Sequence, residues 1–225
     1  MELTPYSVVS LSEGASEYRE LVKAYWNWIQ GPDPDANPKH PTDPNLTFLR
    51  DDVIGSQLKH EVGILTGRGK TEDEAFATTL INATTSMKFF FPIYHVCCVS
   101  EHPYVKGGKC DTPEKRKNAA MFDLNNNYQK WAKITIDGQN EHNIVNDDLD
   151  NYSIESGEFE LRVPQSNNLN REAGFNLPPT KGSYSAYAAG IYLYLKDLQP
   201  GNYRLDFGGR ATDFHTQSIY NISVK

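Results

Sequence analysis

The chain has 225 residues, which is enough for one large β-type domain or two small ones, and 38% of them are hydrophobic. Its 13 tyrosines, 10 phenylalanines and 3 tryptophans exclude a disordered chain. The formal net charge of -7 argues against a nucleic-acid groove, which requires clustered lysines and arginines. We therefore expect a soluble, acidic protein with no nucleic-acid partner.

The sequence leaves the cellular location open. It contains no run of about 18 apolar residues, so no membrane span is expected. The N-terminus lacks the basic and apolar regions of a secretory signal, so the protein is either cytoplasmic or exported with its signal removed. Four Asn-x-Ser/Thr sequons would suit a secreted protein, but they also arise by chance in an Asn-rich chain: Asn45, Asn82, Asn151 and Asn221.

Residues 16–30 carry the clearest helical pattern in the chain. Ser16 is the predicted N-cap, and Gly31 with Pro32 ends the helix. We expect the aromatic face of this amphipathic helix to pack on a sheet. The apolar residues at three-and-four spacing are Tyr18, Leu21, Val22, Tyr25, Trp26 and Ile29.

Residues 31–45 contain five prolines, which exclude both a helix and a central strand. We interpret this segment as a stiff, ordered surface loop. A linker is less favoured, because the single helix before it would then need a core of its own. The sequence thus predicts a single domain over residues 1–225.

Short segments rich in β-branched and aromatic residues follow, at residues 60–66, 78–82 and 87–96. The third segment is apolar at successive positions, which predicts a central strand covered on both faces. Residues 113–130 then predict a second helix with Pro113 in its first turn, weakened from Asn125 onward.

From Trp131 onward the pattern is strand and turn, with Asp137-Gly138 and Pro200-Gly201 as the clearest turns. Several short strands with tight turns predict a mainly β fold. We expect an antiparallel β-sandwich, of jelly-roll or Ig-like type, with an N-terminal helix and one further helix. The predicted strands in this part are residues 131–137, 152–163, 185–195, 202–207 and 218–224.

All three cysteines lie close to two histidines within one short segment. On a continuing strand, side chains alternate, so His95 and Cys97 share one face while Cys98 points to the other. Thiolate and imidazole ligands suit zinc or copper. The candidate metal ligands are His95, Cys97, His102 and Cys110, of which His95 and Cys97 with either of the other two make a feasible set.

Other interpretations of this segment compete with the metal site. Cys110 can form a disulfide with Cys97 or Cys98, or the thiols can simply be buried. Cys97 can also serve as a nucleophile with His95 as its base. Because no third group that would orient His95 can be named, we assign no catalytic residue.

Asn146, Asp148 and Asp150 offer alternating oxygen ligands, which is typical of calcium sites. The segment lacks the glycine and the terminal glutamate of an EF-hand loop. A solvated acidic turn is the simpler interpretation of these residues.

Four tyrosines near the C-terminus form the last candidate surface. If Tyr184, Tyr187, Tyr192 and Tyr194 alternate with inward residues, they make an exposed stacking surface for a sugar or for self-association. The simpler alternative is that these tyrosines cover the core with their hydroxyl groups at its edge.

Several groups of residues, spread over most of the chain, share their order with a known family. They are Tyr25-Trp26-Asn27-Trp28 with Asn37-Pro38, Lys88-Phe89-Phe90-Phe91-Pro92-Ile93, Ile136-Asp137-Gly138, and Leu198-Gln199-Pro200-Gly201-Asn202-Tyr203 with Phe207-Gly208-Gly209 and Tyr220-Asn221-Ile222-Ser223-Val224. In these residues the chain resembles a family of uncharacterised microbial, often exported β-sandwich proteins. The resemblance implies an architecture and no reaction.

Taken together, the patterns favour a non-enzymatic binding or self-assembling protein, because no convergent acid-base motif occurs. Its expected partner is a protein, another copy of itself or a carbohydrate. The alternative is a small metal- or thiol-dependent enzyme centred on the segment from His95 to Cys110.

Overall fold

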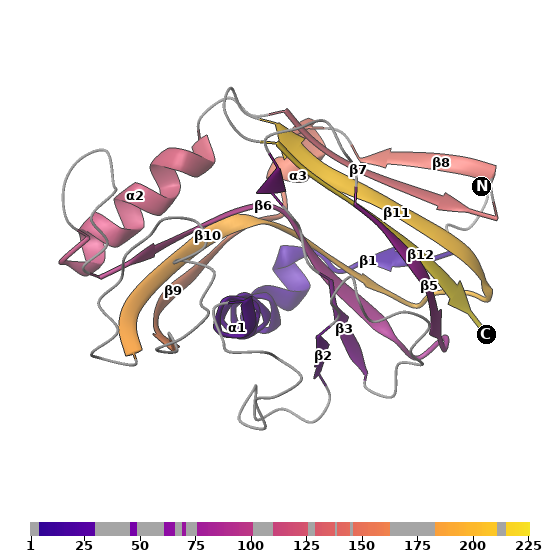
Figure 1. Cartoon of the computed structure of the whole chain (residues 1–225), viewed down its shortest axis with the longest axis horizontal. Helices are drawn as coiled ribbons and strands as arrows, with labels where there is room; N and C mark the ends of the chain where they lie inside the picture. Colours follow the sequence, from indigo (N-terminus) through magenta and orange to yellow (C-terminus); the bar gives the residue numbers. More distant parts are fainter. Residues whose placement is uncertain are drawn as a thin grey trace.

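The protein is mainly β, with two sheets and three helices in the part that the structure describes (Figure 1). This computed structural model describes residues 5–29, 46–48, 61–65, 69–70, 76–100, 110–125, 129–137, 139–144, 146–162, 183–210 and 215–225. The predicted Pro-rich loop at residues 31–45 lies outside these ranges. None of the described helices is long and apolar enough to cross a membrane.

Two long antiparallel strands, β6 and β10, form the centre of the first sheet, as the apolar pattern of residues 87–96 predicted. Its strands in spatial order are β1 (Ser7–Val8) and β9 (Ser153–Arg162), both beside β10 (Ser183–Lys196), followed by β6 (Lys88–Val99), β3 (Val62–Ile64) and β2 (Leu46–Phe48).

The second sheet carries the hairpin that Asp137 predicted. Asp137, with a positive φ of 49°, follows β7, and β8 returns antiparallel to it. The strands of this sheet are β4 (Gly69–Lys70) and β5 (Phe76–Ala83), both beside β12 (His215–Val224), followed by β11 (Gly201–Arg210), β7 (Gln129–Ile136) and β8 (Gln139–Ile144).

The strand pairing is mixed, which departs from the antiparallel order expected from the sequence. β2 and β3 pair in parallel, β3 is parallel to β6, and β5 is parallel to β12. The other described pairs are antiparallel. Tight turns in the sequence identify antiparallel hairpins, whereas parallel neighbours come from distant parts of the chain and leave no such local signal.

The first helix, α1 (Leu11–Ile29), begins five residues earlier than the predicted N-cap Ser16. The carbonyl of Ser10 accepts the first helical hydrogen bond from the Gly14 amide, at 3.0 Å. A Cβ at Gly14 would stand 2.7 Å from a Val9 methyl carbon, so glycine is required where the helix starts against the preceding chain.

The second helix, α2 (Pro113–Asn125), confirms the predicted Pro113 start and ends where the asparagines begin. The third helix, α3 (Asn146–Asp150), was not predicted, because the sequence suggested an acidic turn there. Leu149 is its buried residue and anchors this short helix to the core.

Side chains from the two sheets share one hydrophobic core. Phe91 of β6 and Phe207 of β11 pack with their ring centroids 4.6 Å apart at its centre. Ala120 of α2 joins the same core. Figure 1 shows α2 over one end of β6 and β10, beside the region where the second sheet covers them.

A second core lies on the opposite face of the first sheet, beneath α1 (Figure 1). Tyr18 of α1 packs edge-on against Phe90 and Tyr194, with ring centroids 5.9 Å apart in each pair. The aromatic face predicted for this helix therefore does pack on a sheet. The first sheet is consequently buried on both faces, between α1 on one side and the second sheet with α2 on the other.

Candidate functional site

A bulge in β6 sets which side chains of the His-Cys segment face α1. Pro92 pairs with Tyr192 and Tyr94 pairs with Ile191, so Ile93 is an extra residue in the ladder. The extra residue reverses the alternation, and the side chains of His95 and Cys97 lie on the α1 face of the sheet. The sequence prediction that these two residues share a face is confirmed.

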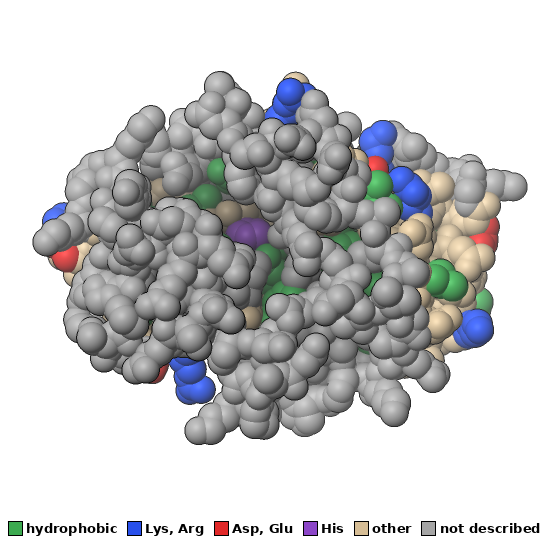
Figure 2. All heavy atoms as spheres, viewed as in Figure 1, with side chains coloured by type: hydrophobic (Ala, Val, Ile, Leu, Met, Phe, Trp, Pro, Cys, Tyr) green, Lys and Arg blue, Asp and Glu red, His purple; other side chains and the backbone are tan. Residues whose placement is uncertain are grey.

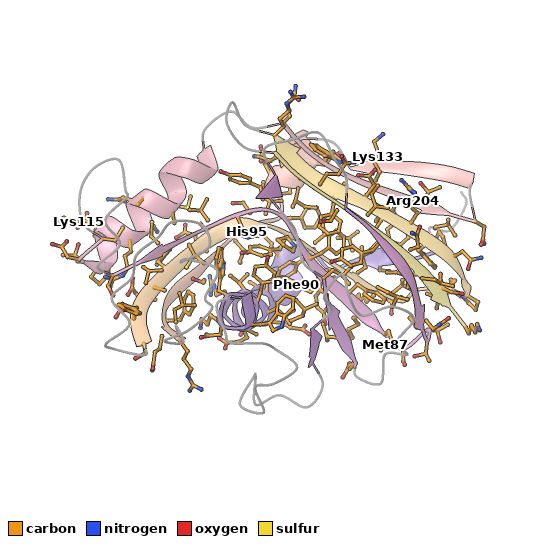
Figure 3. The ribbon with its side chains drawn as sticks, in the orientation of Figure 1. Met87, Phe90, His95, Lys115, Lys133 and Arg204 are labelled. Atoms are coloured by element: carbon orange, nitrogen blue, oxygen red, sulfur yellow. The ribbon has the colours of Figure 1, made fainter. Side chains whose placement is uncertain are left out.

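The His95 ring is enclosed by aromatic side chains. Its centroid lies 5.0 Å from that of Tyr25, 4.8 Å from that of Trp26 and 6.0 Å from that of Tyr192. Nε2 is 3.5 Å from the Tyr25 hydroxyl, while Nδ1 is buried without a hydrogen-bond partner. Figure 2 shows a histidine side chain at the floor of a hollow, at the place where Figure 3 labels His95.

Burial determines the protonation states on this face. It lowers the pKa of His95 to about 3, so the imidazole is neutral at pH 7. Burial also raises the pKa of Cys97 well above its usual value, and the neighbouring thiols of Cys98 and Cys110 raise it further. A nucleophilic cysteine requires a lowered pKa, so this geometry does not favour Cys97 as a nucleophile.

Cys98 points to the other side of β6, where α2 packs, and Cys110 lies just before α2, whose Arg116 donates to the Cys110 carbonyl at 2.8 Å. All three cysteines are free thiols. The predicted metal ligands are therefore divided, because Cys110 lies across the strand from His95 and Cys97. His102 lies outside the described residues, among which no three His, Cys, Asp or Glu side chains are grouped to hold a metal ion.

The prediction of an exposed tyrosine surface is wrong, because Tyr184, Tyr187, Tyr192 and Tyr194 are all buried. Both faces of β10 are covered, one by α1 and the other by the second sheet with α2. Their hydroxyl groups find partners at the edges of the core. Trp26 donates a hydrogen bond to the Tyr192 hydroxyl at 3.2 Å, Tyr194 donates to Glu17 at 2.8 Å, and Tyr187 donates to Glu155.

The predicted calcium ligands Asn146, Asp148 and Asp150 belong to α3 rather than to an open loop. The Asp150 carboxylate lies 2.7 Å from the Lys130 ammonium, and Asp148 is exposed. A calcium ion at Asp150 would have to displace this ammonium. The calcium site remains a prediction.

Sequence reasoning missed a polar network on the outer face of the second sheet. Ala132 and Ile134 of β7 point into the core, so Trp131 and Lys133 point outward. The Asp206 carboxylate of β11 accepts a hydrogen bond from the Trp131 indole at 3.1 Å and another from the Gln217 amide at 2.9 Å. Three strands thus contribute one network around a single oxygen atom, Oδ1 of Asp206.

This network orients a partly exposed aromatic ring. Trp131 and Gln217 both pair with Gly208, on either side of it, so no side chain stands between them. Two exposed cations, Lys133 and Arg204, lie on the same face. Figure 2 shows basic, acidic and hydrophobic side chains side by side at the place where Figure 3 labels these two residues.

The alternating pattern of residues 131–137 was the only sequence signal for this face. It indicates that Trp131 is an outward residue of a strand, but it does not say which strands lie beside it. Asp206 and Gln217 are 75 and 86 residues farther along the chain, so only the sheet topology brings them to Trp131.

No family model, no curated protein and no solved structure matches this chain. The resemblance to exported microbial β-sandwich proteins accordingly stays an expectation.

Proposed function

We propose that the protein is a non-enzymatic carbohydrate-binding protein whose ligand lies on the outer face of the second sheet. The observation that carries the proposal is the hydrogen-bonded placement of the Trp131 ring by Asp206. A tryptophan fixed in this way offers an apolar platform to the C–H face of a sugar at low entropic cost. The neighbouring carboxylate and amide supply acceptors and donors for hydroxyl groups.

The architecture supports this placement. We propose that the two sheets form a β-sandwich, since their inner faces share one core around Phe91 and Phe207. On the first sheet α1 occupies the outer position, whereas the outer face of the second sheet carries the Trp131 network.

The charges around Trp131 favour an acidic saccharide. Lys133, Arg204 and Arg210 are exposed cations on β7 and β11, and Asp206 already accepts two hydrogen bonds. The whole chain carries a net charge of -7, so this cationic group contrasts with the protein as a whole. A uronic-acid carboxylate would pair with these cations.

The enzyme alternative receives less support from the geometry. His95 and Cys97 lie beneath α1 and are half-buried, and desolvation there keeps the imidazole neutral and the thiol protonated. Cys110 lies on the other side of β6. The described part of the His95-to-Cys110 segment therefore offers neither an activated nucleophile nor a convergent ligand set.

Affinity electrophoresis against a panel of neutral and uronic-acid polysaccharides tests the proposal. We expect retardation by an acidic polysaccharide, a loss of at least about tenfold in affinity for Trp131→Ala, and a smaller loss for Trp131→Phe, which keeps a ring. Lys115→Ala, on the exposed face of α2, is the control and should bind normally.

Two results would contradict the proposal. One is that no saccharide retards the wild-type protein. The other is that Trp131→Ala binds as tightly as the wild type while its thermal unfolding shows an intact fold.

A further inference from the structure

The two cysteines that the sequence separates by a loop are neighbours in space. Cys98 is 6% exposed and Cys110 is 1% exposed. Tyr187 of β10 pairs with Cys98 on one side and with Glu158 on the other, so a group that binds Glu158 reaches the row of the sheet that holds Cys98. Cys97 packs on the opposite face of β6, with the residues beneath α1. Since side chains of successive strand residues point to opposite faces, Cys97 cannot take the place of Cys98 beside Cys110.

An ion pair holds Cys110 in this position. The Arg116 guanidinium donates from Nη1 to the Cys110 carbonyl at 2.8 Å. It also bonds the Glu158 carboxylate of β9, through Nε at 2.9 Å and through Nη2 at 2.6 Å. Arg116 is buried and bonds both the Cys110 carbonyl and the Glu158 carboxylate. The segment before α2 is therefore fixed to the sheet that carries Cys98.

We propose that Cys98 and Cys110 are the site of a reversible intramolecular disulfide, and that Cys97 is the thiol left over. The structure shows the reduced form of this pair. The bond would cross-link the end of β6 to the start of α2. This assignment stands apart from carbohydrate binding, which involves the other sheet.

The oxidant that we name is a low-molecular-weight disulfide, such as oxidised glutathione. The thiolate of one cysteine attacks a glutathione sulfur, and one glutathione leaves as its thiolate. The thiolate of the second cysteine then attacks the protein sulfur of the mixed disulfide and releases the other glutathione. The protein loses two protons and two electrons, which the oxidant gains as it becomes two glutathione thiols.

Burial makes the first step slow in the folded protein. It raises the pKa of Cys110, although the nearby Cys98 side chain and the Arg116 charge act in the opposite direction. The test should therefore measure equilibrium after refolding in a glutathione buffer, rather than the rate of oxidation.

The unfolded chain provides the reference. Cys97 and Cys98 are adjacent, so the loops that they close with Cys110 differ by one residue and have nearly equal closure entropies. In 8 M urea, Cys97→Ser and Cys98→Ser should form their remaining disulfide with equilibrium constants within about twofold of each other. In native buffer, the equilibrium constant for disulfide formation should be at least about tenfold larger for Cys97→Ser than for Cys98→Ser. The reason is that the fold holds together only the two thiols that Cys97→Ser retains.

The wild-type protein gives a second measurement that does not depend on how either variant folds. After refolding in oxidised buffer, its mass should fall by two hydrogen atoms, and fragment-ion mass spectrometry should locate the one alkylated thiol at Cys97. Alkylation at Cys98, equal constants for the two variants in native buffer, or three free thiols under oxidising conditions would each overturn the proposal.

Discussion

Gly190 of β10 lies directly opposite His95 of β6, and the missing side chain at this position makes room for the imidazole beneath α1. A Cβ at residue 190 would stand 2.8 Å from the His95 Cβ and 2.6 Å from a ring carbon of Tyr192. It would also stand 2.8 Å from the Tyr94 carbonyl oxygen, which belongs to the backbone and cannot rotate away.

Gly190→Ala should destabilise the protein by about 1–3 kcal/mol, because the added methyl group overpacks a site bounded by backbone and rings. The matched control is Gly209→Ala, whose nearest contact would be 3.3 Å away and which should cost less. Urea unfolding of both variants measures the difference. Equal stability of Gly190→Ala and the wild type would refute the packing argument.

His95 should make stability depend on pH. Its pKa is about 3 in the folded protein and about 6.5 in the unfolded chain, so the unfolded state binds the proton more readily. The neutral ring's contribution is therefore complete above pH 6.5 and declines toward pH 3, by up to about 1.4 kcal/mol per pH unit. His95→Gln should flatten this part of the profile. Identical slopes of stability against pH for the wild type and for His95→Gln between pH 4 and 6 would contradict this prediction.

Asn27 of α1 should protect the outer edge of β9. Its amide donates to the Glu160 carbonyl at 3.2 Å and accepts from the Arg162 amide at 2.9 Å, as a neighbouring strand would. Asn27→Ala should cost about 1–2 kcal/mol of stability. It should also increase association, since an unpaired edge invites another strand.

Chemical unfolding and light scattering together measure the two effects of Asn27→Ala. Lys23→Ala, which removes only the exposed ion pair with Glu20, is the control and should change stability by less than about 0.5 kcal/mol. If the Asn27→Ala variant stays monomeric and its stability is unchanged, Asn27 does not protect the edge of β9.

The ion pair between Arg116 and Glu158 should matter far more than the adjacent exposed pair. Arg116→Ala leaves the Glu158 carboxylate and the Cys110 carbonyl without this donor, and we expect a loss of about 2–4 kcal/mol. Lys115→Ala removes an exposed pair with Asp111 and should change stability by about 0.5 kcal/mol or less. Similar losses for both variants, compared by urea unfolding, would contradict this ranking.

Local patterns predicted most of the larger elements. The three-and-four spacing of Tyr18, Leu21, Val22 and Tyr25 identified α1, although its start was placed too late. The start at Leu11 has a local cap signal of its own, since Ser10 and Glu13 have the spacing of a capping box. The short strands β1, β2 and β4 escaped prediction, because their few residues show no period of their own.

The candidate sites were predicted less well, because they depend on which strands are neighbours. Tyr184, Tyr192 and Tyr194 of β10 face α1, whereas Tyr187 points to the opposite side, and covers on both faces bury all four. Conversely, no sequence pattern around Trp131 indicated that Asp206 and Gln217 would fix its ring.

The sequence by itself determined the mainly β class, the amphipathic first helix and the division of Cys97 from Cys98, since each follows from the period of side chains along a helix or strand. Only the tertiary structure decided which thiol meets Cys110 and which side chains surround Trp131. These contacts join residues far apart in the chain, and the sheet order and the packing of α2 bring them together.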